Sequence, residues 1–176
     1  FNKKKVLNIK NKLKKILFNF YKKINFSNSY FVHRDYHSQN LMKVGKKVAV
    51  IDTQDAIIGN PAYDLVSLID DVRIKTSNSL KKDIYKYYIK KTIFINNENE
   101  IFFMQDFNIL SVQRSLKIIG IFSRLFKRDK KVKYLKFIPY TWKLLEMRMH
   151  SEIFYDLKKI LKDNISKNTR NRFVYK

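Results

Sequence analysis

The residues best suited to chemistry lie in two short segments of the first third of the chain. Asp35 closes the triplet His-Arg-Asp, Asn40 follows it by five residues, and Asp52 follows Asn40 by twelve. A carboxylate can accept the proton of a hydroxyl group, and carboxylate and amide oxygens are ligands that Mg²⁺ prefers. A lone Asp in a loop is usually a turn residue. The combination of His-Arg-Asp with Asn at the fifth place, however, is typical of a phosphoryl-transfer loop.

Short strands are expected to position these residues. Tyr30 to Val32 predicts a buried strand that ends just before the triplet. The β-rich runs 41–44 and 48–51 flank Gly45, Lys46 and Lys47, which predicts a hairpin. Such a hairpin folds back on itself, so we expect it to bring Asp52 beside Asn40 and to form one divalent-cation site from two loops.

The rest of the chain is predicted to be helical. Apolar residues recur at three- and four-residue spacing between Val6 and Ile24, which indicates an amphipathic helix. Asn60 followed by Pro61 is typical of a helix start, so we expect a helix over 61–72. The later helices are predicted over 79–95, 100–126, 139–149 and 151–162. The expected class is therefore α+β, mainly α, with a small β-hairpin at the catalytic and metal-binding loops.

Composition limits the class of protein. The chain has 176 residues, of which 45% are hydrophobic and 15% aromatic, enough for one globular domain with a core. It has no cysteine, which excludes a disulfide framework or a thiolate metal site and fits the cytoplasmic location that we expect. No apolar run approaches the roughly 20 residues of a membrane span, and no signal peptide is recognisable at the amino end.

The formal net charge of +23 has two interpretations. A specific nucleic-acid binder or a protein that binds anionic membranes would carry such an excess. Lysines on solvated helix faces would also produce it, and the clusters are short and separated by other residues. We favour the second interpretation and expect no specific nucleic-acid partner.

At this point a family resemblance becomes visible. Residues 32–42, 50–56 and 59–71 resemble the aminoglycoside phosphotransferase-like branch of the kinase fold, and within it the bacterial cell-wall amino-sugar kinases. His37 lies two residues after Asp35, where protein kinases carry Lys. The resemblance also includes Gln113 and Arg114, and it spans most of the chain from Phe31 to about Leu157.

The resemblance implies a role for each matching residue. Asp35 corresponds to the catalytic base, Asn40 to a magnesium ligand and Asp52 to the principal magnesium ligand. His37 corresponds to the position that faces the transferred phosphate, and Arg34 is expected to stabilise the loop beside buried carboxylates.

Four further residues are expected to have supporting roles. Asp64 matches an Asp that braces the catalytic loop, and Asp55 either supports the metal site or caps a turn. Gln113 and Arg114 either face the sugar or form an exposed pair on an amphipathic helix.

The resemblance also implies an architecture. Residues 1–163 would form the large, carboxyl-terminal lobe of a protein-kinase-like fold, with a catalytic loop at 33–40, a metal loop at 52–55 and a helical bundle over 61–162. Residues 164–176 would be a basic tail that frays. The glycines Gly45, Gly59 and Gly120 do not form a glycine-rich loop, so we expect the amino-terminal nucleotide lobe to be absent from this chain. A second departure from the family pattern is Thr53, since the amino-sugar branch carries an aromatic residue at this position.

The predicted activity is transfer of the γ-phosphate of ATP, with Mg²⁺, to a small-molecule hydroxyl. The favoured acceptor is the anomeric hydroxyl of N-acetylmuramate or N-acetylglucosamine, as in peptidoglycan recycling. An aminoglycoside, a choline-like alcohol or an amino acid is the alternative acceptor. A non-catalytic lobe that binds partners through its basic surface is the alternative from another class. Since half the nucleotide site is missing, this chain alone is expected to be inactive.

Overall fold

The computed structural model describes residues 2–171 and divides the chain into two compact units. Unit 1 comprises Phe1–Ile24 and Ser115–Lys176, and unit 2 comprises Asn25–Arg114. The boundary falls inside α4 (Glu100–Asp129), a helix of 30 residues. All the residues singled out above for chemistry therefore belong to unit 2.

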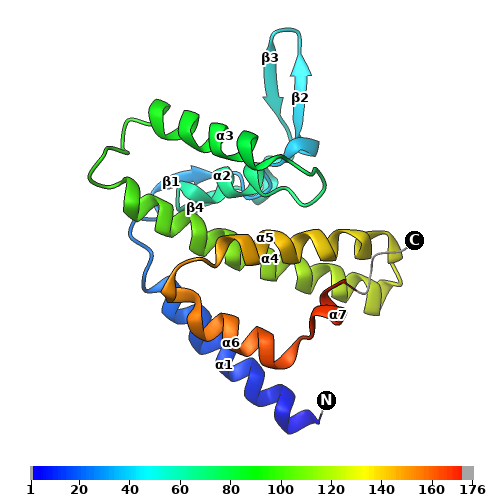
Figure 1. Ribbon diagram of the computed structural model, residues 1–176. Coiled ribbons are helices and arrows are strands. Elements are labelled where there is room, and N and C mark those ends of the chain that lie inside the picture. Colours follow the sequence, from blue (N-terminus) through cyan, green and yellow to red (C-terminus); the bar gives the residue numbers. More distant parts are fainter. Residues whose placement is uncertain (1, 172–176) are drawn as a thin grey trace. The chain divides into compact units, whose positions relative to one another are not determined.

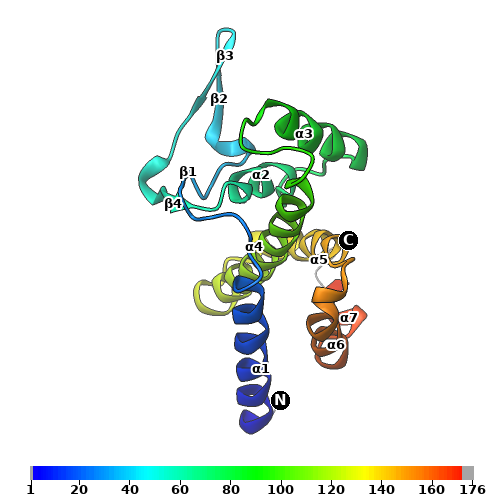
Figure 2. The same ribbon diagram turned by 90° about the vertical axis from the view of Figure 1, so that its left-hand side faces the viewer.

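Unit 2 contains two small antiparallel sheets. Strand β1 (Tyr30–Val32) pairs with β4 (Ile57–Gly59), and β2 (Leu41–Val44) pairs with β3 (Lys47–Val50). The second pair is the predicted hairpin, and Gly45 supplies the positive φ of 59° that its tight turn needs. The hairpin projects away from the rest of unit 2 (Figure 1, Figure 2).

Strand β4 was not predicted from the sequence. It has only two β-favouring residues, Ile57 and Ile58, and Gly59, Asn60 and Pro61 follow them at once as turn and helix-start signals. Its last residue, Gly59, lies opposite Tyr30, and a Cβ there would come within 3.2 Å of the Val32 Cγ2 atom. A glycine at this point therefore permits the close approach of the two strands.

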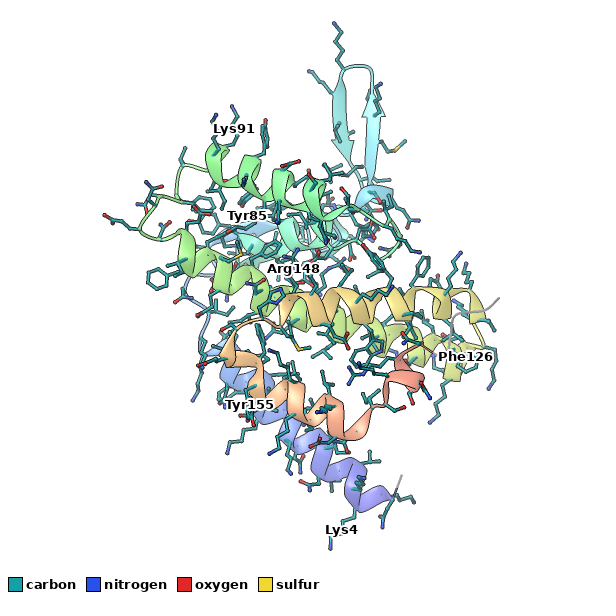
Figure 3. The ribbon with its side chains drawn as sticks, in the orientation of Figure 1. Lys4, Tyr85, Lys91, Phe126, Arg148 and Tyr155 are labelled. Atoms are coloured by element: carbon teal, nitrogen blue, oxygen red, sulfur yellow. The ribbon has the colours of Figure 1, made fainter. Side chains whose placement is uncertain are left out.

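Helices α2 (Ala62–Ile69), α3 (Asn78–Lys91) and the first half of α4 complete unit 2. Their apolar faces meet in one cluster of buried residues, which comprises Ala62, Leu65, Val66, Ile69, Tyr85, Ile95, Phe103 and Phe107. Tyr85 on α3, labelled in Figure 3, packs edge-on against Phe107 and tilted against Phe103. The ring centroids are 5.4 and 6.3 Å away, respectively. Burial of these large side chains is the main stabilisation of the unit.

Unit 1 is helical. It contains α1 (Lys3–Tyr21), the second half of α4, α5 (Ile138–Arg148), α6 (Tyr155–Asn164) and α7 (Lys167–Asn171), with short 3₁₀ turns at 132–137 and 152–154. Helix α1 lies along α6, where Phe20 packs edge-on against Phe154 with ring centroids 5.1 Å apart. No helix within residues 2–171 combines the length and apolarity that crossing a bilayer requires.

The mainly helical α+β class that we predicted is confirmed, with differences at the ends of helices. Helix α2 ends at Ile69, three residues before the predicted end, and the predicted helix over 151–162 begins as a 3₁₀ turn. The tail predicted to fray contains the short helix α7, whose Arg170 lies over the Trp142 ring, 4.9 Å from its centroid. The remaining tail residues, 172–176, lie outside the described residues.

A buried carboxylate holds three parts of unit 2 together. Asp106 on α4 is fully buried, and it accepts hydrogen bonds from the backbone amides of Asn25 and Phe26 at 2.9 and 2.8 Å. It also accepts from the side-chain amides of Asn25 and Asn60, each at 2.9 Å. Asn60 in turn accepts from the Ala62 amide at 2.9 Å and so caps α2. Residues about 80 positions apart are thus fixed by one side chain.

We expect Asp106→Asn to lower the free energy of unfolding by about 2–4 kcal/mol, because the new NH₂ group would face donors and leave at least one of them buried without an acceptor. Urea unfolding followed by circular dichroism measures the change. Asp83→Asn, on the exposed surface of α3, is the matched control and should stay within about 0.5 kcal/mol of the parent protein. Equal stability of the two variants would contradict the role given to Asp106.

Candidate active site

The loop after β1 is held by a side chain from α2. The Asp64 carboxylate accepts from the backbone amides of His33 at 2.6 Å and Arg34 at 2.9 Å. Arg34 has a φ of 71°, a left-handed conformation that is uncommon for a residue with a side chain. The two hydrogen bonds offset the cost of that conformation, which is on the order of 1 kcal/mol or more. Asp64 therefore sets the direction in which the chain leaves β1.

Burial raises the pKa of Asp64, and the two backbone hydrogen bonds from His33 and Arg34 act in the opposite direction. The ionised form is the one that can accept both amides fully, since a protonated carboxyl group loses part of its acceptor capacity.

Asn40 and His37 close the loop around Asp35. The Asp35 carbonyl accepts from the His37 amide at 2.9 Å and from the Asn40 side-chain amide at 3.0 Å. Because the Asn40 nitrogen is used in this bond, its side-chain oxygen is the atom that remains to bind a cation. Asp35 itself is half-buried, and its carboxylate makes no hydrogen bond or ion pair with the residues between 2 and 171.

The hairpin brings the second segment back to this loop, as predicted. Ile51 donates its amide to the Asn40 carbonyl at 3.1 Å, and its own carbonyl lies 2.9 Å from His33 Nε2. The Arg34 guanidinium donates to the Asp55 carbonyl at 3.2 Å. Three hydrogen bonds thus tie the loop after β1 to the segment around Asp52.

Asp52 has a left-handed backbone, with φ 69° and ψ 48°, and precedes a 3₁₀ turn over Thr53–Asp55. It is exposed, and its carboxylate has no hydrogen-bond or ion-pair partner in the described part of the chain. Asp tolerates this conformation better than most residues. Of the three non-glycine residues with positive φ in the described chain, Arg34 and Asp52 belong to the candidate site, and Lys130 follows α4. Strain concentrated in this way is typical of functional sites.

These residues fit a nucleotide-bound Mg²⁺ ion. Such ions usually take one or two carboxylates from the protein, and phosphate and water oxygens supply the other ligands. No group of three or more His, Cys, Asp or Glu side chains within residues 2–171 could hold a metal by itself. Asn40 and Asp52, from loops joined through Ile51, provide the smaller oxygen set that a metal–phosphate complex needs.

A second cluster lies beside His37 and was not predicted from the sequence. Ser38 donates its hydroxyl to Asp71 at 2.7 Å, and Arg73 donates its amide to the same carboxylate at 3.0 Å. An ion pair at 3.4 Å also joins Arg73 to Asp71. Despite burial, which raises it, the pKa of Asp71 is lowered by these hydrogen bonds and by the Arg73 charge.

His37 is buried, and its Nδ1 atom has no hydrogen-bond partner among the described residues. Burial, with the charge of Arg73 next in size, lowers the pKa of His37 below its ordinary value of 6.5. The imidazole is therefore neutral at pH 7.

Arg114 and Gln113 were predicted either to face a substrate or to form an exposed pair. Arg114 is 6% exposed and Gln113 is half-buried, so the pair is not exposed. Burial lowers the pKa of Arg114, and Tyr63 and Asp71 act to raise it. The guanidinium makes no hydrogen bond with any described residue. Its five N–H donors are thus available to bind a ligand. Asp71 and Asp35 are close enough to raise the pKa of Arg114 through their charges.

Comparisons with known proteins agree with the resemblance drawn from the sequence. Residues 25–94 match the phosphotransferase enzyme family. The chain is 31% identical over 133 residues to the N-acetylmuramate/N-acetylglucosamine kinase of Caulobacter vibrioides, an alignment that covers 73% of this chain and 36% of the relative. Proteins of the same name from Neisseria meningitidis and Pseudomonas aeruginosa are 40% and 36% identical over 112 and 120 residues. Those alignments cover 62% and 66% of this chain, and 34% and 35% of the relatives. The chain spans about a third of the length of these relatives.

We expect Asp64→Ala to free the loop after β1 while leaving most of unit 2 folded. Loss of two hydrogen bonds to a carboxylate, each contributing about 1.5–3 kcal/mol, should speed hydrogen exchange of the His33 and Arg34 amides by at least tenfold. The Ala62 and Tyr63 amides, which bond to Asn60, serve as internal controls. Unchanged exchange at His33 and Arg34 would show that other contacts hold the loop.

The lowered pKa of His37 predicts a specific dependence of stability on pH. As pH falls through 6.5, the unfolded chain takes up a proton at this histidine before the folded chain does. The stabilisation that neutral His37 contributes is fully present above pH 6.5. It is lost as the pH falls from 6.5 toward the lower pKa of His37 in the folded state. We expect His37→Gln to flatten this loss.

Urea unfolding measured at several values between about pH 7.5 and 5 tests this expectation. Asp64 and Asp71 are retained in both proteins, so the difference between the two pH profiles isolates His37. Parallel profiles for the parent and His37→Gln would contradict the pKa shift.

Proposed function

We propose that this chain contributes the catalytic residues of an ATP- and Mg²⁺-dependent kinase, because residues 25–94 match the phosphotransferase enzyme family. The observation that best supports the proposal is the pair of available carboxylates, Asp35 and Asp52, on two loops tied together through Ile51. Phosphoryl transfer requires this combination of a group that accepts a proton and groups that hold a metal–phosphate complex.

Asp35 accepts the proton of the acceptor hydroxyl and holds its oxygen in line with the phosphoryl group. The hydrogen bonds from His37 and Asn40 to the Asp35 carbonyl keep Asp35 in position. His37, neutral at pH 7, provides one N–H donor toward a phosphoryl oxygen without adding a charge. Arg34 stabilises the loop by donating a hydrogen bond from its guanidinium to the Asp55 carbonyl.

Asn40 and Asp52 are the proposed metal ligands. When bound, Mg²⁺ neutralises the charge of the nucleotide phosphates and orients them for transfer. The protein contributes a left-handed turn at Asp52 and an amide oxygen at Asn40. The Asn40 side-chain nitrogen donates to the Asp35 carbonyl, and the Ile51 amide donates to the Asn40 carbonyl, before any ligand arrives. This preorganisation reduces the rearrangement that the reaction requires.

The proposed acceptor is the hydroxyl of an amino sugar. The relatives at 31–40% identity are named as kinases of N-acetylmuramate and N-acetylglucosamine. The buried Arg114 supports an oxygen-rich acceptor, because its donors are not used by the described chain. Gln113, half-buried beside it, is proposed as a second contact. The alternative acceptors are an aminoglycoside, a choline-like alcohol and an amino acid. They would need the same base and metal ligands but different contacts with Arg114 and Gln113.

We further propose that the chain supplies the large lobe of a two-lobed kinase that acts in the cytoplasm. A glycine-rich loop and a phosphate-pairing lysine, which complete a kinase nucleotide site, would then come from a separate lobe. Isolated residues 1–176 should bind magnesium-ATP weakly and turn over little acceptor.

The test uses the full natural chain that contains these residues, supplied with labelled ATP and four acceptors: N-acetylmuramate, N-acetylglucosamine, an aminoglycoside and choline. Asp35→Asn should lower kcat by roughly 10²–10⁴-fold with little change in the KM for ATP, because the base is lost and the metal site is not. Asp52→Asn should raise the Mg²⁺ concentration needed for half-maximal rate, and added Mg²⁺ should recover part of the activity.

Asp83→Asn, exposed on α3, is the control for a lost surface carboxylate and should retain activity. A labelled sugar 1-phosphate that disappears with Asp35→Asn supports both the chemistry and the acceptor. Labelling of choline or the aminoglycoside alone would keep the kinase and discard the amino sugar. Full activity of Asp35→Asn on every acceptor would discard the proposed base.

A further inference from the structure

The positive charge of the chain is concentrated in the unit that lacks the candidate active site. Unit 1 contains 26 Lys and Arg against 5 Asp and Glu, a net +21, whereas unit 2 contains 12 against 10, a net +2. Binding of nucleotide phosphates in unit 2 therefore does not account for the charge. An asymmetry of this size between two parts of a chain is typical of proteins that contact a nucleic acid or a membrane surface.

Within unit 1 the charge is most one-sided in α1. Residues 3–23 contain nine lysines, and no acidic residue occurs before Asp35. The lysines of α1 are all exposed, and Lys4 marks the amino end of the helix (Figure 3). The helix therefore has no acidic side chain of its own to neutralise its lysines. Asp156 and Asp163 of α6 line a pocket together with three of them, Lys5, Lys12 and Lys15.

One face of α1 mixes these lysines with large exposed apolar residues. We call this face the basic–apolar stripe; its members follow one another at three- and four-residue spacing and are Lys3, Leu7, Lys10, Lys14, Phe18 and Tyr21. Leu7 and Phe18 are each 57% exposed and Tyr21 is 60% exposed. The Lys22 ammonium lies 4.8 Å from the centroid of the Phe18 ring, so charge and apolar surface are in direct contact.

The stripe is distinct from the face that α1 uses for folding. Ile9, Leu13 and Ile16 are half-buried and Phe20 is buried, and this second row includes the contact with Phe154 at the start of α6. Burial of the inner row explains why the helix is amphipathic. It does not explain why Leu7, Phe18 and Tyr21 lie among lysines on the outer face.

The combination of lysines and apolar residues in the basic–apolar stripe favours one of two possible anionic partners. Nucleic-acid phosphates would satisfy the lysines, and a base could stack on Phe18, but Leu7 would gain nothing there. An anionic lipid surface satisfies both sets, because lysines pair with the headgroups while leucine and aromatic rings enter the boundary with the acyl chains. A 19-residue helix is about 28 Å long and can lie flat in this layer.

We propose that the basic–apolar stripe of α1 docks the protein reversibly on an anionic lipid surface. The helix lies on the bilayer and does not cross it. Attraction of the lysines brings the helix to the headgroups, and burial of Leu7, Phe18 and Tyr21 holds it there. The proposal rests on unit 1 alone and is independent of the kinase activity proposed for unit 2.

Sedimentation of the full natural chain with lipid vesicles tests the proposal. We expect no binding to phosphatidylcholine and clear, salt-sensitive binding when about 30% phosphatidylglycerol is included. The triple variant Lys3→Glu, Lys10→Glu, Lys14→Glu should lower the affinity for the anionic vesicles at least tenfold. The double variant Leu7→Ser, Phe18→Ser should also lower it about tenfold and should abolish the binding that survives raised salt.

A matched triple variant on unit 2 controls for net charge. Lys82, Lys86 and Lys90 are exposed on α3, and their replacement by Glu changes the charge equally, so binding should stay within about twofold of the parent. Circular dichroism should show unchanged helix content in each variant, because every substituted side chain is exposed.

Three results would overturn the proposal. An equal loss of binding in the α1 and α3 triple variants would show that net charge alone attracts the vesicles. Equal binding to neutral and anionic vesicles would remove the role of the lysines. Loss of duplex DNA binding in the α1 variants, with vesicle binding unchanged, would identify nucleic acid as the partner.

Discussion

The hydrogen bonds from His33 and Arg34 to the Asp64 carboxylate are the constraint on which the candidate site depends. They hold Arg34 in a left-handed conformation and so determine where Asp35 lies after β1. Asp64 can do this only because α2 begins at a fixed place, and Asn60, bonded to Asp106, caps that helix. The buried Asp106 therefore fixes the start of the helix, and the half-buried Asp64 on that helix fixes the loop.

Much of the local structure was predictable because its signals are local. The strand at 30–32 and the hairpin around Gly45 follow from short β-rich runs and a turn residue, and both were found where expected. Helix positions followed from apolar spacing, and their ends were less certain because a capping bond or a 3₁₀ turn changes them by a few residues. Strand β4 has only two β-favouring residues, Ile57 and Ile58, before the turn residues Gly59, Asn60 and Pro61, so no strand was predicted there.

The site was predictable to a similar extent and for a similar reason. Asp35, Asn40 and Asp52 stand in a spacing that chemistry requires, so the sequence reveals them, although their roles stay predictions. Asp106 and the Asp71–Arg73 pair left no such trace, because their partners are distant in sequence or are backbone groups. The charge of +23 was interpreted from short, separated clusters of lysine along the chain. Its concentration in unit 1 became visible only when the chain was divided into folded units.

The left-handed turn at Asp52 has a consequence for how such a protein can change over evolutionary time. Asp, Asn and Gly are the residues that adopt this backbone most readily. A single exchange of Asp52 for Asn or Gly would remove the carboxylate and leave the turn in place, along with the bonds from Ile51 to Asn40 and His33. A descendant could thus lose the chemistry in one step and keep the fold, becoming a pseudoenzyme that is free to acquire another use for its remaining surfaces.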